Sequence, residues 1–597
     1  FMIRGFGTAN SNYTSVNGLF GIASNLRNQL EPYERVEVIK GPTALLNNNP
    51  NIRAVGGSIN LVPKRAEDEP ITSVTGQFMT ESHLGGHADF GRRFGTDKRF
   101  GLRVNLAERG GETPIDNNSE DIRIGSVALD YRGENFRLTG DFVHQDRLIN
   151  SPQVLFLSVA NGVAVPKAPD ANNNLEQPWA FLDSSDTYVA VGGEVDISDS
   201  VTVYAKLGHN WSTDTYVTSS GSITNGEGDT SMTVGAYPYA TKTWAGETGV
   251  RGEFETGAVS HNLSAALSAY NMLGEYPSQT LQAGVASNIY SPSYISPADY
   301  SFINRSFPTS SDQESQAVAI SDTIGFFDDR LNLLLGARYQ TINQKSFNST
   351  TGVQTSSYAD NKISPAAGIV IEPVRDVSVY MNYMENLEPG PTAGSTLSNA
   401  GEQFAPIVSK QWEAGVKWDA KTFGVTASIF QIIQPSQTTE NNTLSVGGEQ
   451  RNRGLELEMF GEATKGVRLL AGLAFTEGKL TKTANGTNEG NTAVGVPEVQ
   501  ANLGVEWDVP GIDGLTFLGR SLYTSSSYVN AANTQEIPDW WRLDIGARYA
   551  FAAYETPLIA RLNVENVLDD NYWQSAGRSF ITTGAPLTAL LSLTAEF

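Results

Sequence analysis

The chain has 597 residues, of which 18% are charged and 40% hydrophobic, and its formal net charge is −24. The acidic balance argues against nucleic acid as a partner, because phosphate binding needs positive charge. The absence of cysteine removes disulfides, zinc ribbons, iron–sulfur clusters and cysteine nucleophiles. No stretch approaches the roughly 18 apolar residues of a membrane helix. A membrane β-barrel stays compatible with this composition, because its signal in each segment is weak.

The first seventy residues carry short, irregular patterns. Residues 36–42 predict a strand that ends in a Gly41-Pro42 turn, residues 43–46 one helical turn, and residues 56–62 a second strand. None of these segments is long enough to cross a membrane. We therefore expect a small α/β domain over residues 1–66, an acidic link at 67–70, and a second domain over 71–597. The chain opens at Phe1 in mid-pattern, so we expect the true N-terminus to lie upstream of it.

Beyond residue 71 the dominant pattern is alternation with a period of two. Each such segment places apolar residues on one face and polar residues on the other, as a β-strand with one apolar and one solvated face requires. The clearest segments are 201–207, 412–419, 455–459, 541–549 and 587–597. In the last of them we expect Leu591 and Leu593 to face lipid and Ser592 to face the interior.

Alternation alone is also typical of a soluble β-sandwich or propeller. Two features favour a membrane barrel. The segments run for about nine to eleven residues, with aromatic residues such as Trp412 and Trp418 at their ends, where an aromatic belt meets lipid headgroups. Connections also alternate in length: 196–200 and 419–422 are tight turns, whereas roughly 145–186 and 277–314 are long polar loops.

Several motifs carry a family resemblance. Residues 3–6 (IRGF), 16–18 (VNG), 34–42 (ERVEVIKGP) and 56–65 (GGSINLVPKR) resemble the plug domain of TonB-dependent outer-membrane receptors. Residues 411–417, 453–458 and 562–569 and the terminal Phe597 resemble the barrel of the same family. The segments 56–60 and 178–180 are most similar to its ferric-siderophore branch. Asn47-Asn48 departs from the family, which usually has Tyr-Gly at this place.

The resemblance implies an all-β transmembrane barrel of about 22 antiparallel strands, with the small α/β plug inside the lumen. It implies a receptor in the outer membrane of a Gram-negative bacterium, surrounded by lipid and lipopolysaccharide. Such a receptor imports a ferric siderophore with energy from TonB, ExbB and ExbD, and carries ferric iron only as the chelate, without an intrinsic cofactor. Cobalamin, haem or carbohydrate as the ligand, and a passive porin-like barrel, remain alternatives.

The resemblance also places candidate ligand contacts. Arg4 would reach the ligand from the plug, with a salt bridge inside the plug as the competing role, and Phe20, Gly21 and Ile22 would form a neighbouring apical loop. Aromatic loop residues would supply buried area, although each could instead belong to the aromatic belt or to a loop core. These aromatic candidates are Trp179, Phe181, Tyr237, Tyr239, Tyr290, Tyr294 and Phe404.

Four plug cations, Arg35, Lys40, Lys64 and Arg65, stand out in an acidic chain. We expect them to pair with carboxylates of the inner barrel wall such as Glu456 and Glu458, although solvated surface charge is the simpler alternative. No catalytic or metal site is predicted. No nucleophile–base pair stands out, and His83 and His87 on one strand would lie about 13 Å apart.

The residues constrain the class of ligand only weakly. Hydroxamate is slightly favoured over catecholate, because a chain of charge −24 would repel a trianionic ferric catecholate unless the site were locally basic. The residues leave open whether an N-terminal signalling domain or a TonB-contacting segment precedes Phe1.

Overall fold

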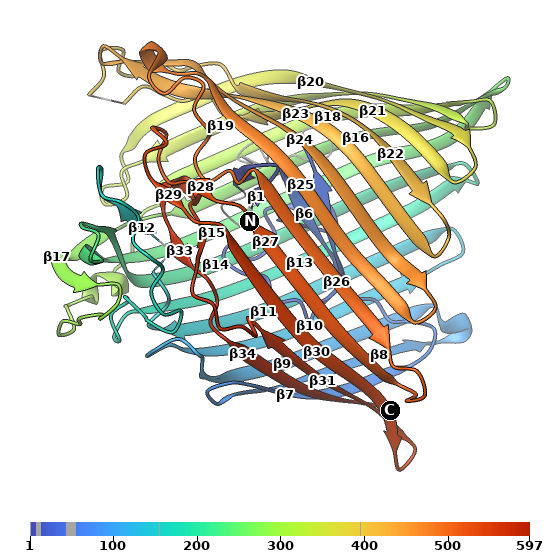
Figure 1. Ribbon diagram of the computed structural model, residues 1–597. Helices are drawn as coiled ribbons and strands as arrows, with labels where there is room; N and C mark the ends of the chain where they lie inside the picture. The colour runs from blue at the N-terminus through green and yellow to red at the C-terminus, as the bar shows by residue number, and fades with distance from the viewer. Residues whose placement is uncertain (1, 8–13, 43–54, 155, 395) are drawn as a thin grey trace.

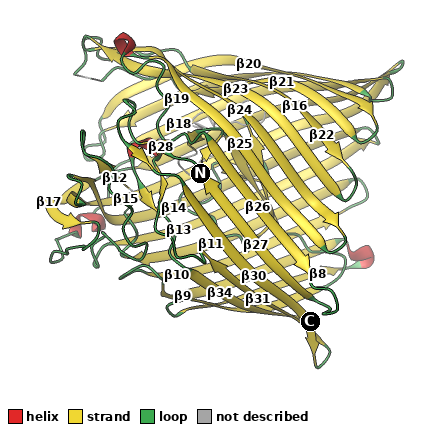
Figure 2. Cartoon of the chain, viewed as in Figure 1, coloured by secondary structure: helices red, strands yellow, loops and turns green. Residues whose placement is uncertain are grey.

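The computed structural model describes residues 2–7, 14–42, 55–154, 156–394 and 396–597. Nearly all of the regular structure is β-strand (Figure 2). A closed barrel begins at Ile71 and ends at Glu596, and a four-stranded sheet from the first 63 residues lies within it (Figure 1). We call the part before residue 67 the plug.

Consecutive strands of the barrel pair antiparallel, and β34 closes the ring against β7 through pairs such as Ala595 with Val74. Twenty-four strands of the described chain join this sheet. Two of them, β12 (Phe156–Val159) and β17 (Gln279–Asn288), only add to the ends of β14 and β15, so 22 strands form the wall, as expected. The strands of the wall are β7 (Ile71–Met79), β8 (His83–Phe94), β9 (Phe100–Glu112), β10 (Ser119–Arg132), β11 (Phe136–Asn150), β13 (Phe181–Ser198), β14 (Val201–Ile223), β15 (Asp229–Thr256), β16 (Val259–Glu275), β18 (Ser311–Phe326), β19 (Leu331–Phe347), β20 (Gln354–Val374), β21 (Val377–Glu388), β22 (Ile407–Asp419), β23 (Phe423–Glu440), β24 (Thr443–Thr464), β25 (Val467–Lys482), β26 (Val499–Asp508), β27 (Leu515–Thr524), β30 (Trp540–Ala553), β31 (Thr556–Glu565) and β34 (Thr588–Glu596).

The two rims of the barrel differ, as the sequence predicts. One rim carries tight connections such as 199–200 and 420–422, and the chain also ends there. The other rim carries the long loops, including 151–180, 276–310 and 566–587. Figure 1 shows β12 and β17 gathered at this long-loop rim.

Many strands are longer than the nine to eleven residues that the alternation suggests. The longest, β15, has 28 residues, and β14 has 23. Trp211 and Trp244 mark the aromatic belt on their outer face. Beyond the belt both strands continue towards the long-loop rim, where the outer face no longer meets lipid. Backbone pairing therefore continues after the apolar alternation has stopped.

The outer face of the wall is apolar, as a lipid-facing surface must be. Leu591 and Leu593 are 51% and 48% exposed, whereas Ser592 between them points inward. Trp412 and Trp418 are exposed on the same outer surface of β22. The predicted orientation of the last strand is thus confirmed.

The plug sheet has the order β4-β3-β6-β5. Its long strands, β5 (Tyr33–Lys40) and β6 (Gly57–Pro63), confirm the two strands predicted there. The predicted helical turn at 43–46 lies outside the described residues. The remaining plug strands are β1 (Met2–Ile3), β2 (Phe6–Gly7), β3 (Thr14–Val16) and β4 (Leu19–Phe20), and two short hairpins on the long-loop rim use β28 (Ser527–Tyr528), β29 (Glu536–Ile537), β32 (Trp573–Ser575) and β33 (Thr582–Thr583).

Helical structure in the described chain is confined to short 3-10 turns: η2 (Thr96–Lys98), η3 (Ser301–Asn304), η4 (Ala484–Gly486) and η5 (Gly577–Ser579). Within the described ranges, no helix has the length and apolar character needed to cross a membrane.

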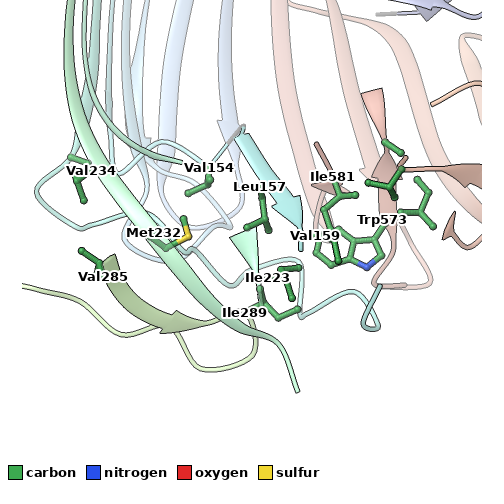
Figure 3. Packing of buried hydrophobic residues seen from close by; sticks show 14 of the residues in the cluster. Val154, Leu157, Val159, Ile223, Met232, Val234, Val285, Ile289, Trp573 and Ile581 are labelled. Atoms are coloured by element: carbon green, nitrogen blue, oxygen red, sulfur yellow. The ribbon is translucent and has the colours of Figure 1, made fainter. Parts of the chain in front are cut away.

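An apolar cluster holds the long loops together (Figure 3). Leu157 of loop 151–180, Met232 of β15 and Trp573 of loop 566–587 are all buried in it. The Trp573 indole also donates to the Pro166 carbonyl, at 2.8 Å. Loop 151–180 is therefore anchored to loop 566–587 across the ends of the intervening strands.

Candidate functional site

The turn between β1 and β2 carries Arg4 to the inner wall of the barrel. Arg4 and Gly5 both have positive φ, which forms this tight turn. The Arg4 guanidinium donates to Glu413 at 2.6 Å, to Glu456 at 2.9 Å and to Gln411 at 2.9 Å. Burial opposes the charged form, but the bonds and charges of the two glutamates outweigh it and raise the pKa of Arg4.

In the structure Arg4 contacts the wall of the barrel, which differs from the open position that we expected. Its side chain is 1% exposed and makes four hydrogen bonds to the wall, so it does not project into an open vestibule. The competing role, a salt bridge, is nearer to the structure, but the carboxylates belong to β22 and β24 rather than to the plug. Arg4 links the two parts of the molecule.

The other plug cations mostly behave as predicted. Three of the four pair with the inner wall, in the pairs Lys40–Glu458, Lys64–Asp89 and Arg65–Asp141. Lys40 also lies 3.3 Å from Glu456, which joins it to the Arg4 contact. Arg35 is the exception, because it pairs with Glu37 of its own strand and is mostly exposed. The pairs reach β8, β11 and β24, so polar contacts hold the plug on several sides of the lumen.

The predicted apical loop at residues 20–22 is packed against the wall. Phe20 is 6% exposed and Ile22 is fully buried, beside Tyr270 and Met272 of β16. A Cβ on Gly21 would come within 2.6 Å of the Tyr270 ring. This segment therefore fills the space between plug and barrel, and the side chains of Phe20 and Ile22 are buried there.

A pocket of about 430 Å³ lies further along the same plug loop. Residues 27–31 of the plug form one side of it. The other side comes from strand ends next to the long-loop rim: Gln77, Met79, His83, Arg109, Glu120, Ile122, Arg147 and Leu590. The pocket thus lies between the plug and the wall, close to the long-loop rim. Sequence reasoning missed it, because its residues come from six strands and one loop.

Hydrogen bonds to the wall fix the plug side of this pocket. Gln145 of β11 donates from its side-chain amide to the Arg27 carbonyl at 2.8 Å and accepts from the Gln29 backbone N–H at 3.3 Å. Arg109 of β9 donates to the side chains of Gln29 and Glu31. The loop is therefore tied to two strands and presents Arg27 in a defined place.

The charges around the pocket are mostly paired. Arg109 is held by Glu31, and Arg147 donates to Glu120 at 2.6 Å. Among the described residues, no carboxylate lies within ion-pair distance of Arg27, whose side chain is accessible to solvent although protein surrounds it on several sides. Burial, together with the nearby Arg147 charge, lowers the pKa of Arg27, and Glu120 acts in the opposite direction.

The aromatic candidates mainly connect loops to one another. The Trp179 ring stacks on Tyr300, and its indole N–H donates to the Ile295 carbonyl at 3.0 Å. Phe181 meets the same Tyr300 edge-on. The hydroxyls of Tyr290 and Tyr294 donate to carbonyls of loop 151–180, at 2.9 and 3.1 Å.

The remaining three candidates lie elsewhere. Tyr237 and Tyr239 are half-buried on β15, where Tyr239 packs against Tyr276 with ring centroids 4.3 Å apart. Phe404 is half-buried in loop 389–406, where its backbone N–H donates to the Pro391 carbonyl. The structure does not bring the seven aromatic candidates together in one site.

Loop 151–180 also contains a fully buried carboxylate. Glu176 accepts hydrogen bonds from the Ser219 backbone N–H and the Thr218 hydroxyl, both at 2.7 Å, and from the Gln177 N–H at 2.9 Å. Burial raises the pKa of Glu176, although these donors oppose the shift. This contact fastens the loop to the end of β14.

Comparisons with known proteins agree with this architecture. The family model described as TonB dependent receptor-like, beta-barrel, matches residues 80–567. The chain belongs to the TonB-dependent receptor family. It is 36% identical to the ferrichrome receptor FcuA of Yersinia enterocolitica, over 100% of this chain and 81% of the relative. It is 24% identical to a ferrichrome outer membrane transporter and phage receptor of Escherichia coli K12, over 97% of this chain and 81% of the relative.

Solved structures give the same result. The ferric preacinetobactin receptor BauA of Acinetobacter baumannii superposes with a TM-score of 0.93 at 36% identity, covering 100% of this chain and 90% of that one. The family is one of outer-membrane receptors, so the long-loop rim is the extracellular side and the tight turns are periplasmic. The predicted family, fold class and outer-membrane location are confirmed.

Proposed function

We propose that this protein binds a ferric siderophore from outside the cell and imports it with energy transmitted by TonB. The observation that carries the proposal is a plug that is fastened to the inner wall of the barrel. Ion pairs from Arg4, Lys40, Lys64 and Arg65 hold the plug to the wall, so passage requires that the plug move. A barrel of this width without a plug would leave an open channel.

The arrangement favours an active receptor over a passive pore. Polar contacts in a polar lumen can break and re-form, which suits a plug that is displaced by force. In this proposal TonB acts with ExbB and ExbD, and outer-membrane lipid and lipopolysaccharide surround the wall. Iron passes only as the chelate, with no resident cofactor and no catalysed reaction. The plug domain comprises residues 1–66 and the barrel domain residues 71–597.

The ligand would enter from the extracellular side and meet the plug first at the pocket lined by residues 27–31. At this pocket Arg27 would contact the ligand, in place of Arg4, Phe20 and Ile22, which we expected to do so. Of the aromatic candidates, Tyr290 and Tyr294 keep exposed ring surface on the loops, and we propose them as the first contacts during entry.

Growth on defined iron sources tests this function. A Gram-negative strain that lacks its own siderophore receptors would express the full-length protein under iron limitation, with a panel of purified ferric siderophores as the only iron source. The proposal requires growth on at least one ferric siderophore. Growth on none of them, together with growth on cobalamin or haem in the matching auxotroph, would contradict it.

A further inference from the structure

The pocket beside the plug differs from the rest of the molecule in its charge. Three guanidinium groups, those of Arg27, Arg109 and Arg147, meet two carboxylates there, those of Glu31 and Glu120. The pocket is therefore locally positive in a chain whose net charge is −24. A recess with low-dielectric walls concentrates this local potential instead of averaging it over the surface.

The carboxylates do not neutralise all of the guanidinium groups. Glu31 is engaged by Arg109, and Glu120 by Arg147. Arg27 keeps its planar donor fork without a carboxylate partner in the described part of the chain. A guanidinium offers parallel N–H donors that match anionic oxygen atoms held side by side. Such pairs of anionic oxygens surround ferric iron in catecholate and carboxylate chelates.

The pocket also holds Arg27 in place. The Arg27 carbonyl accepts from Gln145, and the loop beyond it is fixed by Arg109. A donor whose backbone is already fixed loses less conformational freedom on binding than one on a free loop. Leu30 and His83 also line the pocket. The Leu30 side chain is exposed, whereas the His83 ring is buried and its Nε2 has no hydrogen-bond partner among the described residues.

From this geometry we propose that the ligand is an anionic ferric chelate, and that its negatively charged oxygens dock on Arg27. The inference rests on the proposed function, since it names the chemical class of the ligand imported through this lumen. It reverses the slight preference for hydroxamate that overall charge suggested, because local charge at the pocket has the opposite sign to the chain.

Two matched probes test the class. One is the ferric complex of a synthetic tripodal tris-catecholate, which is trianionic, and the other is the ferric complex of a tris-hydroxamate on the same tripod, which is uncharged. Binding of each to the purified full-length receptor in detergent would be measured by retention of radioactive iron, at low and at moderate salt. We expect the trianionic probe to bind more tightly, with an affinity that falls as salt rises.

The variant Arg27→Gln removes the positive charge and keeps a polar side chain. It should weaken binding of the trianionic probe by about 10- to 150-fold, the range for a hydrogen bond to a charged group, and leave the uncharged probe nearly unaffected. Arg35→Gln is the matched control, because Arg35 is exposed on the plug and pairs only with Glu37 among the described residues. It should leave both affinities unchanged.

The outcomes separate the inference from the function it rests on. Tighter binding of the uncharged probe, or equal binding of the trianionic probe by the native protein and Arg27→Gln, would overturn the inference while leaving siderophore binding intact. Binding of neither probe, from a receptor that also supports no growth on any ferric siderophore, would overturn both. A loss restricted to the trianionic probe in Arg27→Gln supports the proposal.

Discussion

Replacing Arg4 by alanine should loosen the plug without unfolding the barrel. Arg4 makes four hydrogen bonds to the inner wall, and its removal leaves the side chains of Glu413 and Glu456 facing each other with little solvent, at 11% and 10% exposure. The strands that carry these glutamates are paired over their whole length without Arg4. The substitution should therefore weaken the attachment of the plug to the wall and not the folding of the barrel.

The free-energy cost of Arg4→Ala depends on the partners that Glu413 and Glu456 keep once Arg4 is removed. Removing one partner of a buried ion pair costs about 3–5 kcal/mol. Here Lys40 still lies 3.3 Å from Glu456, and the Tyr380 hydroxyl still donates to Glu413 at 2.6 Å. We therefore expect the lower end, about 3 kcal/mol, which corresponds to an increase of roughly 100-fold in the population of unseated plug.

The assay uses the absence of cysteine from the chain. A single cysteine introduced by Ala23→Cys lies in the packed interface between plug and wall, where Ala23 is 3% exposed. Its rate of reaction with a maleimide then reports how often the plug leaves the wall. Adding Arg4→Ala should raise this rate by about two orders of magnitude, provided that reseating is faster than labelling.

Arg123→Ala is the matched control. Arg123 pairs with Glu108 at 3.0 Å, but both side chains are largely exposed, and pairs of this kind contribute at most about 1 kcal/mol. It should leave the labelling rate nearly unchanged. If Arg4→Ala labels no faster than the native background, or if both substitutions accelerate labelling equally, the Arg4 contact does not hold the plug.

Three further predictions concern the wall, the plug and the loops. Leu591→Arg should destabilise the barrel by roughly 2–4 kcal/mol near the midplane and Ser592→Arg by much less; equal losses in lipid refolding titrations would contradict the orientation. Deleting residues 1–66 should leave a folded barrel that leaks small solutes in liposome-swelling assays. A deletion variant that stays impermeable would contradict the assignment of residues 1–66 as the plug. Because the folded loop raises the pKa of Glu176, protonation favours the folded loop, whose stability should fall as pH rises through that pKa. Hydrogen exchange of loop 151–180, corrected for intrinsic rates, should show this fall in the native protein and not in Glu176→Gln.

The strands of the wall were predictable from local patterns, whereas their number came from the family resemblance. Alternation in 587–597 correctly indicated both the strand and the orientation of Leu591, because lipid on one side imposes a period of two. The full length of β15 was not predictable in this way. Its outer portion lies above the membrane, where water meets both faces and no apolar period is required.

The polar contacts of the plug were predictable in kind but not in every partner. A polar lumen and an acidic chain made pairing of Lys40 and Arg65 with wall carboxylates a sound expectation. The direction of Arg4 was not, because a motif gives the position of a residue in the plug and not the conformation of its turn. The positive φ of Arg4 sends its side chain to the wall.

The pocket beside the plug could not be found by motif or spacing. Arg27, Arg109 and Arg147 are separated by dozens of residues, and only closure of the barrel around the plug brings them to one place. One signal was present in the sequence: Arg27 is the only cation between Phe20 and Glu34. Its isolation in a loop without neighbouring cations singles it out, although it does not identify the strands that face it.

Energised uptake of iron tests directly whether TonB drives import through this receptor. Cells that lack other siderophore receptors and express the full-length protein would receive a radioactive ferric siderophore that supports their growth, in the presence and absence of TonB. We expect binding at the surface in both strains, and accumulation inside only with TonB and an intact proton gradient. Equal accumulation without TonB would contradict this expectation, because a plug fastened by buried ion pairs should not admit the chelate unaided.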